Sequence, residues 1–510
     1  MLVRVFSAAV LGLDAYQIEV EVDVAKRPPG QSIVGLPDAA VKESRDRVRA
    51  ALENSGFDFP RGYFTINLAP ADTKKEGPLY DLPIALGMLF ASEQLSADKL
   101  NGTVVVGELS LDGSVRSVNG LLPICLSLAN KNKTILVPKA NADEAALVSS
   151  LKVIPINTLK DAADYLIGEK RIAPHKVDVT SLLNSEPDYS LDFADVKGQG
   201  HIKRALEISA AGGHNLLMVG SPGSGKTMLA RRIPTILPPL SLNEALEVTK
   251  LYSISGLLSG KGSLVTERPF RSPHHTTSAV GVTGGGRIPK PGEISLSHLG
   301  VLFLDEFPEF ERSVLEVLRQ PLEDGTVTIS RAHSSLTYPA QFMLIASMNP
   351  CPCGRLYDSH KSCTCTPFEI QRYWKKLSGP LLDRIDIQLE VPRLKPEELS
   401  AMPNGESSQI IRQRVVAARN IQLQRFSDSA VFSNARMTPK QIKQYCSLER
   451  EAEQLLKAAI VHLKLSARAY DKVLKVARTI ADLDHSESIK AHHIAEATQY
   501  RSLDRKDGER

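Results

Sequence analysis

Hydrophobic and polar residues alternate along two segments near the start of the chain, which is the pattern of half-buried strands. The segment DAAVKESRDRVRAALENSG (residues 38–56) instead has helical spacing and ends at a glycine. These patterns predict a mixed α/β domain over residues 1–168. Its expected strands are YQIEVEVDV (16–24), YFTINLAP (63–70), TVVVGELSL (103–111, as short strands) and TILVP (134–138).

The remaining chain divides into three parts. Residues 169–190 show no periodicity and hold two prolines, so they are expected to form a linker. Residues 191–395 alternate short apolar strands with helical and polar stretches, which predicts a second α/β unit, and residues 396–510 read as helical. The expected strands of the second unit are NLLMVG (215–220), GVLFLDE (300–306) and FMLIASMNP (342–350).

Composition narrows the class of protein. A chain of 510 residues predicts two to four domains. The first 24 residues have no long apolar core, and no apolar run reaches about 18 residues, so we expect a cytoplasmic protein without a membrane partner. Residues 401–510 hold 19 Lys and Arg against 13 Asp and Glu, so the basic excess lies in the helical C-terminal part.

The segment GSPGSGKT follows an apolar strand and precedes a helical run, MLARRIPTIL (228–237). This is the phosphate-loop pattern in its required context, and it predicts binding of ATP. Glycines let backbone N–H groups curl around phosphates, Lys226 adds positive charge, and Thr227 offers a hydroxyl to Mg²⁺. The predicted nucleotide-binding residues are Gly220, Ser221, Pro222, Gly223, Ser224, Gly225, Lys226 and Thr227.

Acidic and amide residues end the next two strands. In VLFLDE (301–306), Asp305 is expected to bind Mg²⁺ together with Thr227, and Glu306 to polarise the attacking water. Asn349 ends the following strand, where its amide can orient that water, the role called sensor 1. The alternative is an asparagine that only turns the chain before Pro350.

Two arginines complete the expected catalytic set. GPLLDRIDIQLEV (379–391) places Arg384 in a loop before a strand, and LSARAYDKVL (465–474) places Arg468 at the start of a helix. Arg384 is the candidate finger that acts on a neighbouring subunit, and Arg468 the candidate sensor of the helical lid. Surface salt bridges are the alternative for both.

Four of the six cysteines lie within SMNPCPCGRLYDSHKSCTC (347–365). Cys351, Cys353, Cys363 and Cys365 form two pairs that suit a structural Zn²⁺ site, although zinc pairs are usually separated by two to four residues rather than one. Ordinary reduced thiols and redox-sensitive thiols remain alternatives. His274 and His275 are adjacent, which is poor spacing for metal ligands, and they are expected to be structural or to face a substrate.

Four longer segments resemble the magnesium-chelatase-like branch of AAA+ ATPases, and within it the competence protein ComM subfamily. They are PFRSPHHTTSAVGVTGGG (269–286), PGEISLSHLGVLFLDEFPEF (291–310), VLRQPLEDG (317–325) and NPCPCG (349–354). The resemblance implies an AAA+ α/β core with a helical lid that works as a hexameric ring. It also implies action on DNA, with ATP-driven migration of branched recombination intermediates during natural transformation.

The N-terminal part resembles the Lon-protease-domain fold. In KKEGPLYDLPIAL (74–86), Leu79 stands where Lon-type enzymes carry the nucleophilic serine, and Leu122 stands where they carry the activating lysine. Leucine can neither attack a carbonyl nor accept a proton, so proteolysis at this site is not expected. The domain is expected to organise the ring or to contact DNA.

Three functions therefore compete. The first is a homohexameric DNA motor whose partners are single-stranded and branched DNA and recombination proteins. The second is a chelatase-like or protein-remodelling ATPase that uses the same ATP site on another substrate. The third is a scaffold that binds ATP and hardly hydrolyses it, against which the combination of Glu306, Asn349, Arg384 and Arg468 argues.

Overall fold

The computed structural model covers the whole chain, whose described residues group into two compact units. The structure describes residues 2–501 except 29, 72, 74, 76, 97–99, 130–132, 185–188, 259–261, 287–288, 332–333, 357–361, 394–404, 430 and 464–465. Unit 1 comprises residues 1–185 and 242–265, and unit 2 comprises residues 186–241 and 266–510. The expected domain boundary at residue 396 lies outside the described residues.

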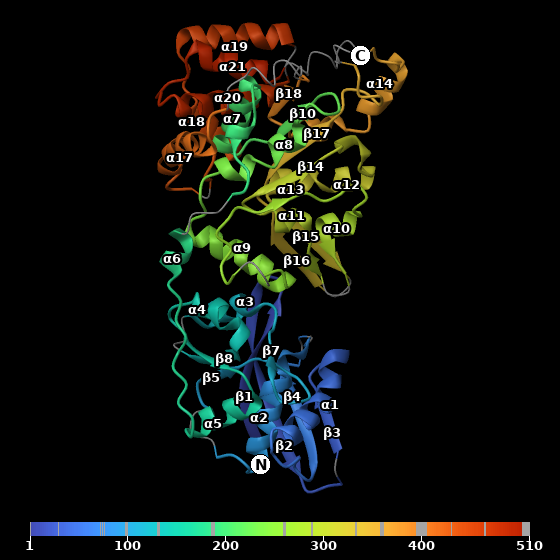
Figure 1. Ribbon diagram of the computed structural model, residues 1–510, viewed down its shortest axis with the longest axis vertical. Coiled ribbons are helices and arrows are strands. Elements are labelled where there is room, and N and C mark those ends of the chain that lie inside the picture. Colours follow the sequence, from blue (N-terminus) through green and yellow to red (C-terminus); the bar gives the residue numbers. More distant parts are fainter. Residues whose placement is uncertain are drawn as a thin grey trace. The chain divides into compact units, whose positions relative to one another are not determined.

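Unit 1 is built on a seven-stranded mixed sheet with strand order β3-β4-β2-β1-β5-β8-β9 (Figure 1). The predicted alternation is confirmed in β2, where Ile18, Val20 and Val22 are buried while the acidic residues between them are more exposed. The strands are β1 (Leu2–Leu11), β2 (Asp14–Ala25), β3 (Gly30–Val34), β4 (Tyr63–Ala69), β5 (Thr103–Val105), β8 (Thr134–Pro138) and β9 (Lys152–Ile156). A separate two-stranded ribbon pairs β6 (Glu108–Leu109) with β7 (Val115–Arg116).

Helices of unit 1 pack on this sheet and on one another. The predicted first helix is confirmed as α1, which Asp38 caps by accepting a hydrogen bond from the Val41 N–H. The helices are α1 (Ala39–Asn54), α2 (Asp81–Ala91), α3 (Leu121–Leu128), α4 (Ala142–Ala146), α5 (Leu159–Ile167), α6 (Val179–Asn184) and α9 (Leu242–Ser255). Helix α6 lies in the segment expected to be an irregular linker.

Helix α9 belongs to unit 1 although the chain reaches it only after the phosphate loop. It packs on α3, and Ser253 Oγ donates a hydrogen bond of 2.5 Å to the buried carboxylate of Glu144. The same carboxylate accepts hydrogen bonds from the Leu122 N–H and from Asn141. The sequence pattern did not separate this segment from the second α/β unit.

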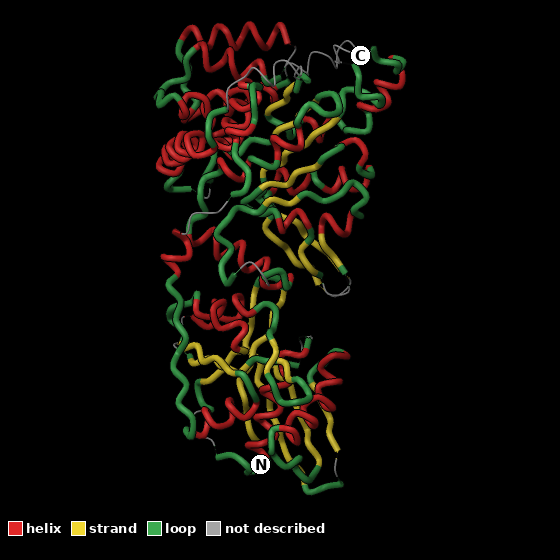
Figure 2. The backbone as a smooth tube through the Cα atoms, in the orientation of Figure 1, coloured by secondary structure: helices red, strands yellow, loops and turns green. Residues whose placement is uncertain are grey.

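Unit 2 contains a five-stranded, fully parallel sheet with order β11-β14-β17-β10-β18. Its central strands are buried on both faces, which explains why they read as continuous apolar runs in the sequence. Figure 2 shows these strands (yellow) as one layer with helices (red) beside it. The strands are β10 (Leu216–Val219), β11 (Phe270–Arg271), β14 (Val301–Leu304), β17 (Met343–Met348) and β18 (Ile387–Glu390).

Short elements connect these strands. Two hairpins stand apart from the sheet: β12 (Gly284–Gly285) with β13 (Lys290–Pro291), and β15 (Thr326–Arg331) with β16 (Ser334–Pro339). The helices are α7 (Gly200–Gly212), α8 (Lys226–Ala230), α10 (Ala279–Thr283), α11 (Glu293–Leu296), α12 (Arg312–Val317), α13 (Arg319–Asp324), α14 (Pro367–Trp374) and α15 (Gly379–Leu382).

The C-terminal part is helical, as the sequence predicts, and shares one hydrophobic core with the strands of unit 2. Its helices are α17 (Ser408–Arg425), α18 (Pro439–Tyr445), α19 (Arg450–Leu463), α20 (Ala467–Leu483) and α21 (Ala491–Gln499). The predicted fold class is confirmed: an N-terminal α/β domain, a parallel α/β core and a helical C-terminal region. Among the helices described, none is long and apolar enough to cross a membrane.

Candidate nucleotide site and cysteine cluster

The phosphate-loop segment connects β10 to α8 at the carboxyl edge of the parallel sheet. Gly223 and Gly225 have φ values of 77° and 89°, which side-chain-bearing residues rarely adopt, so both glycines are required by the backbone of the loop. Lys226 is buried, and its Nζ donates hydrogen bonds to the backbone carbonyls of Gly220 (2.6 Å) and Ser221 (3.1 Å). The amine therefore lies inside the curl of the loop, where it can meet phosphate oxygens.

Two features of this loop fit a nucleotide triphosphate. The Ser224 hydroxyl is buried without a hydrogen-bond partner among the described residues, so a polar ligand would satisfy it. Burial lowers the pKa of Lys226, whereas the nearby Asp305 carboxylate acts in the opposite direction. An arriving polyphosphate would favour the charged amine further.

The acid predicted to hold magnesium stands across from the loop. Thr227 Oγ1 donates a 2.6 Å hydrogen bond to Asp305 Oδ2, and the Ser347 hydroxyl donates to Oδ1. The Glu306 backbone N–H also donates to Oδ1, at 3.0 Å. A threonine hydroxyl beside a carboxylate is the oxygen-donor pair that Mg²⁺ uses in phosphate-loop proteins, so these residues fit the ion.

Asn349 follows β17, which lies between β14 and β10 in the sheet. The parallel registers place Val219 opposite Met348 and Leu304 opposite Ala346, so all three strands end at one edge. The Gly220 N–H donates to the Met348 carbonyl at 3.1 Å. The loop, the Asp305–Glu306 pair and Asn349 therefore converge, as strand order predicts.

His275 is a neighbour of Glu306 that the sequence did not predict. Its Nδ1 lies 3.3 Å from Glu306 Oε2, and its ring packs against that of His274 at 4.1 Å between centroids. Since β11 pairs in parallel with β14, the loop after β11 emerges at the same edge as Glu306. No sequence pattern marks this pairing, because β11 is only two residues long, and the approach of His275 to Glu306 could therefore not be predicted.

Arg384 and Arg468 come together with each other rather than with the phosphate loop. The Arg384 guanidinium donates to Glu323 and to the Pro380 carbonyl, and Arg468 Nη1 lies 3.6 Å from Asp383 Oδ2. Both arginines line one cavity of about 450 Å³, and no residue of the phosphate loop is among its described lining residues.

The sheet register explains this separation. Strand β18 runs parallel to β10, with Ile387 opposite Leu216 and Glu390 opposite Val219. Arg384 precedes β18 whereas the phosphate loop follows β10, so the two lie at opposite edges. Four residues of parallel strand span roughly 13 Å. This distance is longer than the Arg384 side chain can bridge to the phosphate loop of its own chain.

A buried ionic pair supports the Arg384 loop. Asp386 lies 3.3 Å from His214 Nδ1 and 3.4 Å from Lys472 Nζ, and Lys472 also donates to the Ile385 carbonyl at 3.0 Å. Although burial acts to raise the pKa of Asp386, Lys472 and His214 hold it well below its usual range. Helix α20 is thereby connected to the loop that carries Arg384.

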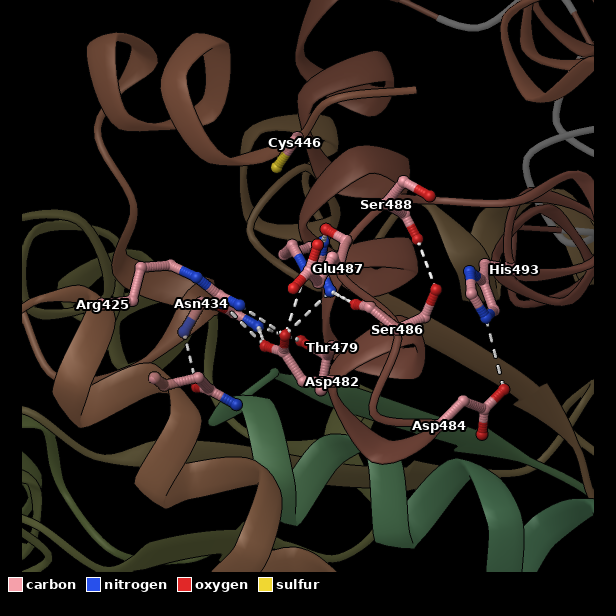
Figure 3. A network of polar contacts seen from close by, with 12 residues as sticks. Arg425, Asn434, Cys446, Thr479, Asp482, Asp484, Ser486, Glu487, Ser488 and His493 are labelled. Carbon is pink, nitrogen blue, oxygen red and sulfur yellow. Dashed lines mark hydrogen bonds and ion pairs between the residues drawn. The ribbon is translucent and has the colours of Figure 1, made fainter. Parts of the chain in front are cut away.

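The same helix carries the polar network of Figure 3. Asp482 accepts hydrogen bonds from Arg425 (2.5 and 2.8 Å), Arg478 (3.0 Å) and Asn434 (2.7 Å). Thr479, one turn earlier, contacts His214 Nε2 at 2.8 Å. A continuous set of polar contacts therefore runs from the lid helices to Asp386.

The four clustered cysteines bring their sulfurs together, as the sequence predicts. The three Sγ–Sγ distances among Cys351, Cys353 and Cys363 are 3.4 to 3.6 Å, and all four sulfurs, including that of Cys365, lie within 4.8 Å of one another. A tetrahedral zinc with Zn–S bonds of about 2.3 Å requires sulfurs about 3.8 Å apart. All four are free cysteines, and their arrangement fits this metal.

Local hydrogen bonds differ among these thiols. Burial raises the pKa of Cys351 to about 12. Burial also acts to raise the pKa of Cys353, but N–H groups of Thr364 and Arg355 outweigh it and lower this pKa to about 5. At least one thiolate ligand is therefore available at neutral pH.

Asp484, His492 and His493 form a second group whose ligand atoms lie within 4.8 Å of one another. However, His493 Nδ1 accepts a hydrogen bond from the Lys490 N–H, so the proton of the neutral ring is on Nε2. That Nε2 lies 3.3 Å from Asp484 Oδ2 (Figure 3), and a protonated ring nitrogen has no lone pair to offer a metal ion. The group is therefore a helix-end contact rather than a metal site.

Comparison with known proteins gives the family. Family models match residues 192–399 (magnesium chelatase, subunit ChlI), 20–141 (subunit ChlI of Mg-chelatase) and 405–501 (ChlI C-terminal). The chain is 47% identical to the YifB protein of Escherichia coli and 44% identical to competence protein ComM of Haemophilus influenzae. Both alignments cover 98% of this chain and 97% of the relative.

A more distant match extends over part of the chain only. The magnesium-chelatase 38 kDa subunit of Cereibacter sphaeroides is 24% identical over 174 residues, which are 31% of this chain and 52% of that subunit. Full-length identity above 40% to several relatives, three ChlI models in sequence order and the loop–acid geometry agree. The chain belongs to the magnesium-chelatase ChlI family, a family of AAA-type ATPases, and is a close relative of YifB and ComM.

Proposed function

We propose that this protein is a cytoplasmic ATP-driven motor that works as a hexameric ring on branched DNA. In this role it moves the branch points of recombination intermediates during natural transformation. The observation that carries the proposal is 44% identity, over nearly the whole of both chains, to a protein named for competence. The geometry of the ATP site and of the two arginines supports the motor part.

The chain's own residues suit hydrolysis. Lys226 and the loop N–H groups bind the phosphates, and Thr227 and Asp305 hold Mg²⁺, which neutralises charge on the phosphate oxygens when bound. Glu306 accepts a proton from the attacking water, and Asn349 orients that water. The Glu306 side chain is 58% exposed, so a water molecule can reach its carboxylate.

The opposite-edge position of Arg384 supports a ring. In an isolated chain, neither Arg384 nor Arg468 lines the phosphate loop. If the edge carrying both arginines faces the phosphate loop of a neighbour, each interface completes one site. We therefore assign Arg384 as the finger and Arg468 as the lid sensor at the interface between subunits.

Charge supports a nucleic-acid substrate. The excess of six basic residues in residues 401–510 favours phosphate contacts, which need no base sequence. Single-stranded and branched DNA are the proposed substrates, and recombination proteins the proposed further partners. Binding should weaken with salt, with a log–log slope near −0.9 per neutralised phosphate on duplex DNA.

The cysteine cluster is proposed to hold one structural Zn²⁺. Four sulfurs at the observed spacing leave no open ligand position, so the ion would stabilise the fold of residues 351–365 rather than take part in hydrolysis. A closed site of this kind contributes roughly 10–16 kcal/mol of binding free energy to folding in small zinc domains.

The test is resolution of a synthetic four-way or three-stranded junction by the purified protein. Wild type should convert it to duplex products only with hydrolysable ATP. Lys226→Ala should fail through lost phosphate binding, whereas Glu306→Gln should bind ATP and DNA but stall. Glu309→Gln is the matched control, because Glu309 lies in the same turn and its carboxylate forms a 3.1 Å ion pair with the exposed Lys376.

Two outcomes would change the assignment. Brisk hydrolysis without junction resolution under any loading condition would refute the DNA motor and favour the chelatase-like or protein-remodelling alternative. Binding of ATP with hardly any turnover would instead favour the scaffold. The more distant identity to a magnesium-chelatase subunit makes the first of these the competing function to test.

A further inference from the structure

The cysteine cluster lies directly against the phosphate loop. Gly354 closes the first turn of the cluster: its N–H donates to the Cys351 carbonyl at 2.9 Å, and its φ is 77°. A Cβ added to Gly354 would lie 2.6 Å from Pro222 Cδ and 2.8 Å from Pro222 Cγ. The turn that begins at Cys351 is therefore in close contact with Pro222, the third residue of GSPGSGKT.

The turn is also fixed to the sheet edge that carries the ATP site. It follows Asn349 by two residues, and the Pro350 carbonyl accepts a hydrogen bond of 3.0 Å from Trp374 Nε1. Trp374 ends α14, which begins directly after Cys365 and is capped by Thr366 and Glu369. Both ends of the cysteine-containing segment are thus anchored. Every described contact among the four cysteines involves a sulfur atom, which meets either another sulfur or a backbone N–H.

We infer that the metal at the four cysteines regulates the ATP site by holding the Cys351–Gly354 turn against Pro222. Without the ion, the two cysteine pairs have no strong bond between them, and the turn loses its fixed position. The phosphate loop then loses one of its supporting contacts and must be ordered by the nucleotide itself. The inference rests on the proposed ATP and zinc binding, and it assigns the zinc site a role in nucleotide affinity.

The expected size of the effect is about tenfold. Ordering the backbone of one residue opposes binding by an amount that corresponds to roughly a tenfold change in Kd. Pro222 is the phosphate-loop residue nearest to a Cβ built on Gly354, so one or two loop residues set the scale. Hydrolysis per bound ATP should change less than affinity, because Glu306 and Asp305 do not depend on this contact.

Two variants separate the metal from the contact. Gly354→Ala keeps all four cysteines but places a methyl group against Pro222 at a positive φ, so zinc should remain at about one per chain. Cys353→Ser should lose zinc. Both should weaken binding of a fluorescent ATP analogue about tenfold, measured by titration of the full-length protein in excess Mg²⁺. Gly262→Ala is the matched control, since Gly262 has φ 80° and open space around its Cβ position.

Zinc content by mass spectrometry and nucleotide Kd are measured on each preparation, and wild type is also measured after treatment with a zinc-selective chelator. Unchanged Kd after metal loss, or in Gly354→Ala, would overturn the inference while leaving the zinc proposal intact. Wild type without zinc would overturn both. Failure of Lys226→Ala to weaken ATP binding would instead refute the proposed ATP site, so the two failures are distinguishable.

Discussion

Asp386 provides the sharpest prediction, because it links the Arg384 loop to helix α20. Asp386→Asn removes the charge that faces Lys472 at 3.4 Å and His214 at 3.3 Å. Both side chains of the ion pair are largely inaccessible, 10% for Asp386 and 14% for Lys472, so water replaces the lost carboxylate poorly. Breaking a buried pair on one side costs about 3–5 kcal/mol, since the other charge is left uncompensated.

This loss should be visible as a lower melting temperature of unit 2 and as a lower kcat. For a unit of about 300 residues, 3 kcal/mol corresponds to roughly 5 °C. Because the loop before β18 would no longer hold Arg384 in place, turnover should fall while ATP affinity stays unchanged. Asp383→Asn is the matched control: Asp383 is 43% exposed and its contact with Arg468 is 3.6 Å, so its loss should cost no more than about 1 kcal/mol.

The pH dependence has a definite sign. The folded-state pKa of Asp386 is depressed, so its contribution is present above the unfolded value of about 3.9 and is lost as pH falls through the folded value. Wild type should therefore lose stability on acidification, and Asp386→Asn should lose less. A melting temperature within 2 °C of wild type at pH 7, or the same acid dependence in both proteins, would refute the reasoning.

Three further predictions follow from the site. Arg384→Ala should lower turnover by roughly 10³- to 10⁵-fold while ATP still binds. Mixing Arg384→Ala subunits with Glu306→Gln subunits should restore some activity. No recovery at any mixing ratio would contradict action between subunits. Zinc should be present at about one per chain and absent from Cys363→Ser, by elemental analysis of reduced protein. His275→Ala should lower kcat about tenfold with KM unchanged, because the 3.3 Å contact of its Nδ1 with the Glu306 carboxylate is lost; His275→Asn should restore most of it, and equal effects of His274→Ala would argue for a general structural role.

The sequence predicted the fold class and the place of the phosphate-loop segment between a strand and a helix, because both follow local patterns. Apolar runs marked the buried strands, and glycines with Lys226 and Thr227 marked the loop. Local reasoning failed where a proline decides the outcome. The run at residues 228–237 was predicted to be helical, but α8 ends at Ala230 and a 3-10 turn (Ile233–Ile236) follows, since Pro234 has no N–H to continue an α-helix.

Contacts between distant segments could not be predicted in the same way. His275 approaches Glu306 only because a two-residue strand pairs with β14, and no periodicity marks a strand that short. Residues 242–265 read as part of the ATPase, yet their buried face fits α3 of unit 1. The contact of Gly354 with Pro222 joins positions 132 residues apart and leaves no trace in either local pattern.

Parallel strands give the ATPase sheet two chemically different edges, and this difference is the structural argument for the proposed ring. Residues that follow strands, namely the phosphate loop, Asp305 and Asn349, gather at the carboxyl edge, whereas Arg384 precedes β18 and lies at the amino edge. No rotation of a side chain exchanges these edges, because the register fixes both. A lid movement that brought Arg468 to the phosphate loop of its own chain would remove Arg468 from the cavity that it shares with Arg384. It would also break the ion pair between Asp386 and Lys472, at a cost of several kcal/mol. Packing one chain's amino edge against the next chain's carboxyl edge needs no such break, and a heterologous contact of this kind, repeated with a rotation that closes, gives the proposed ring.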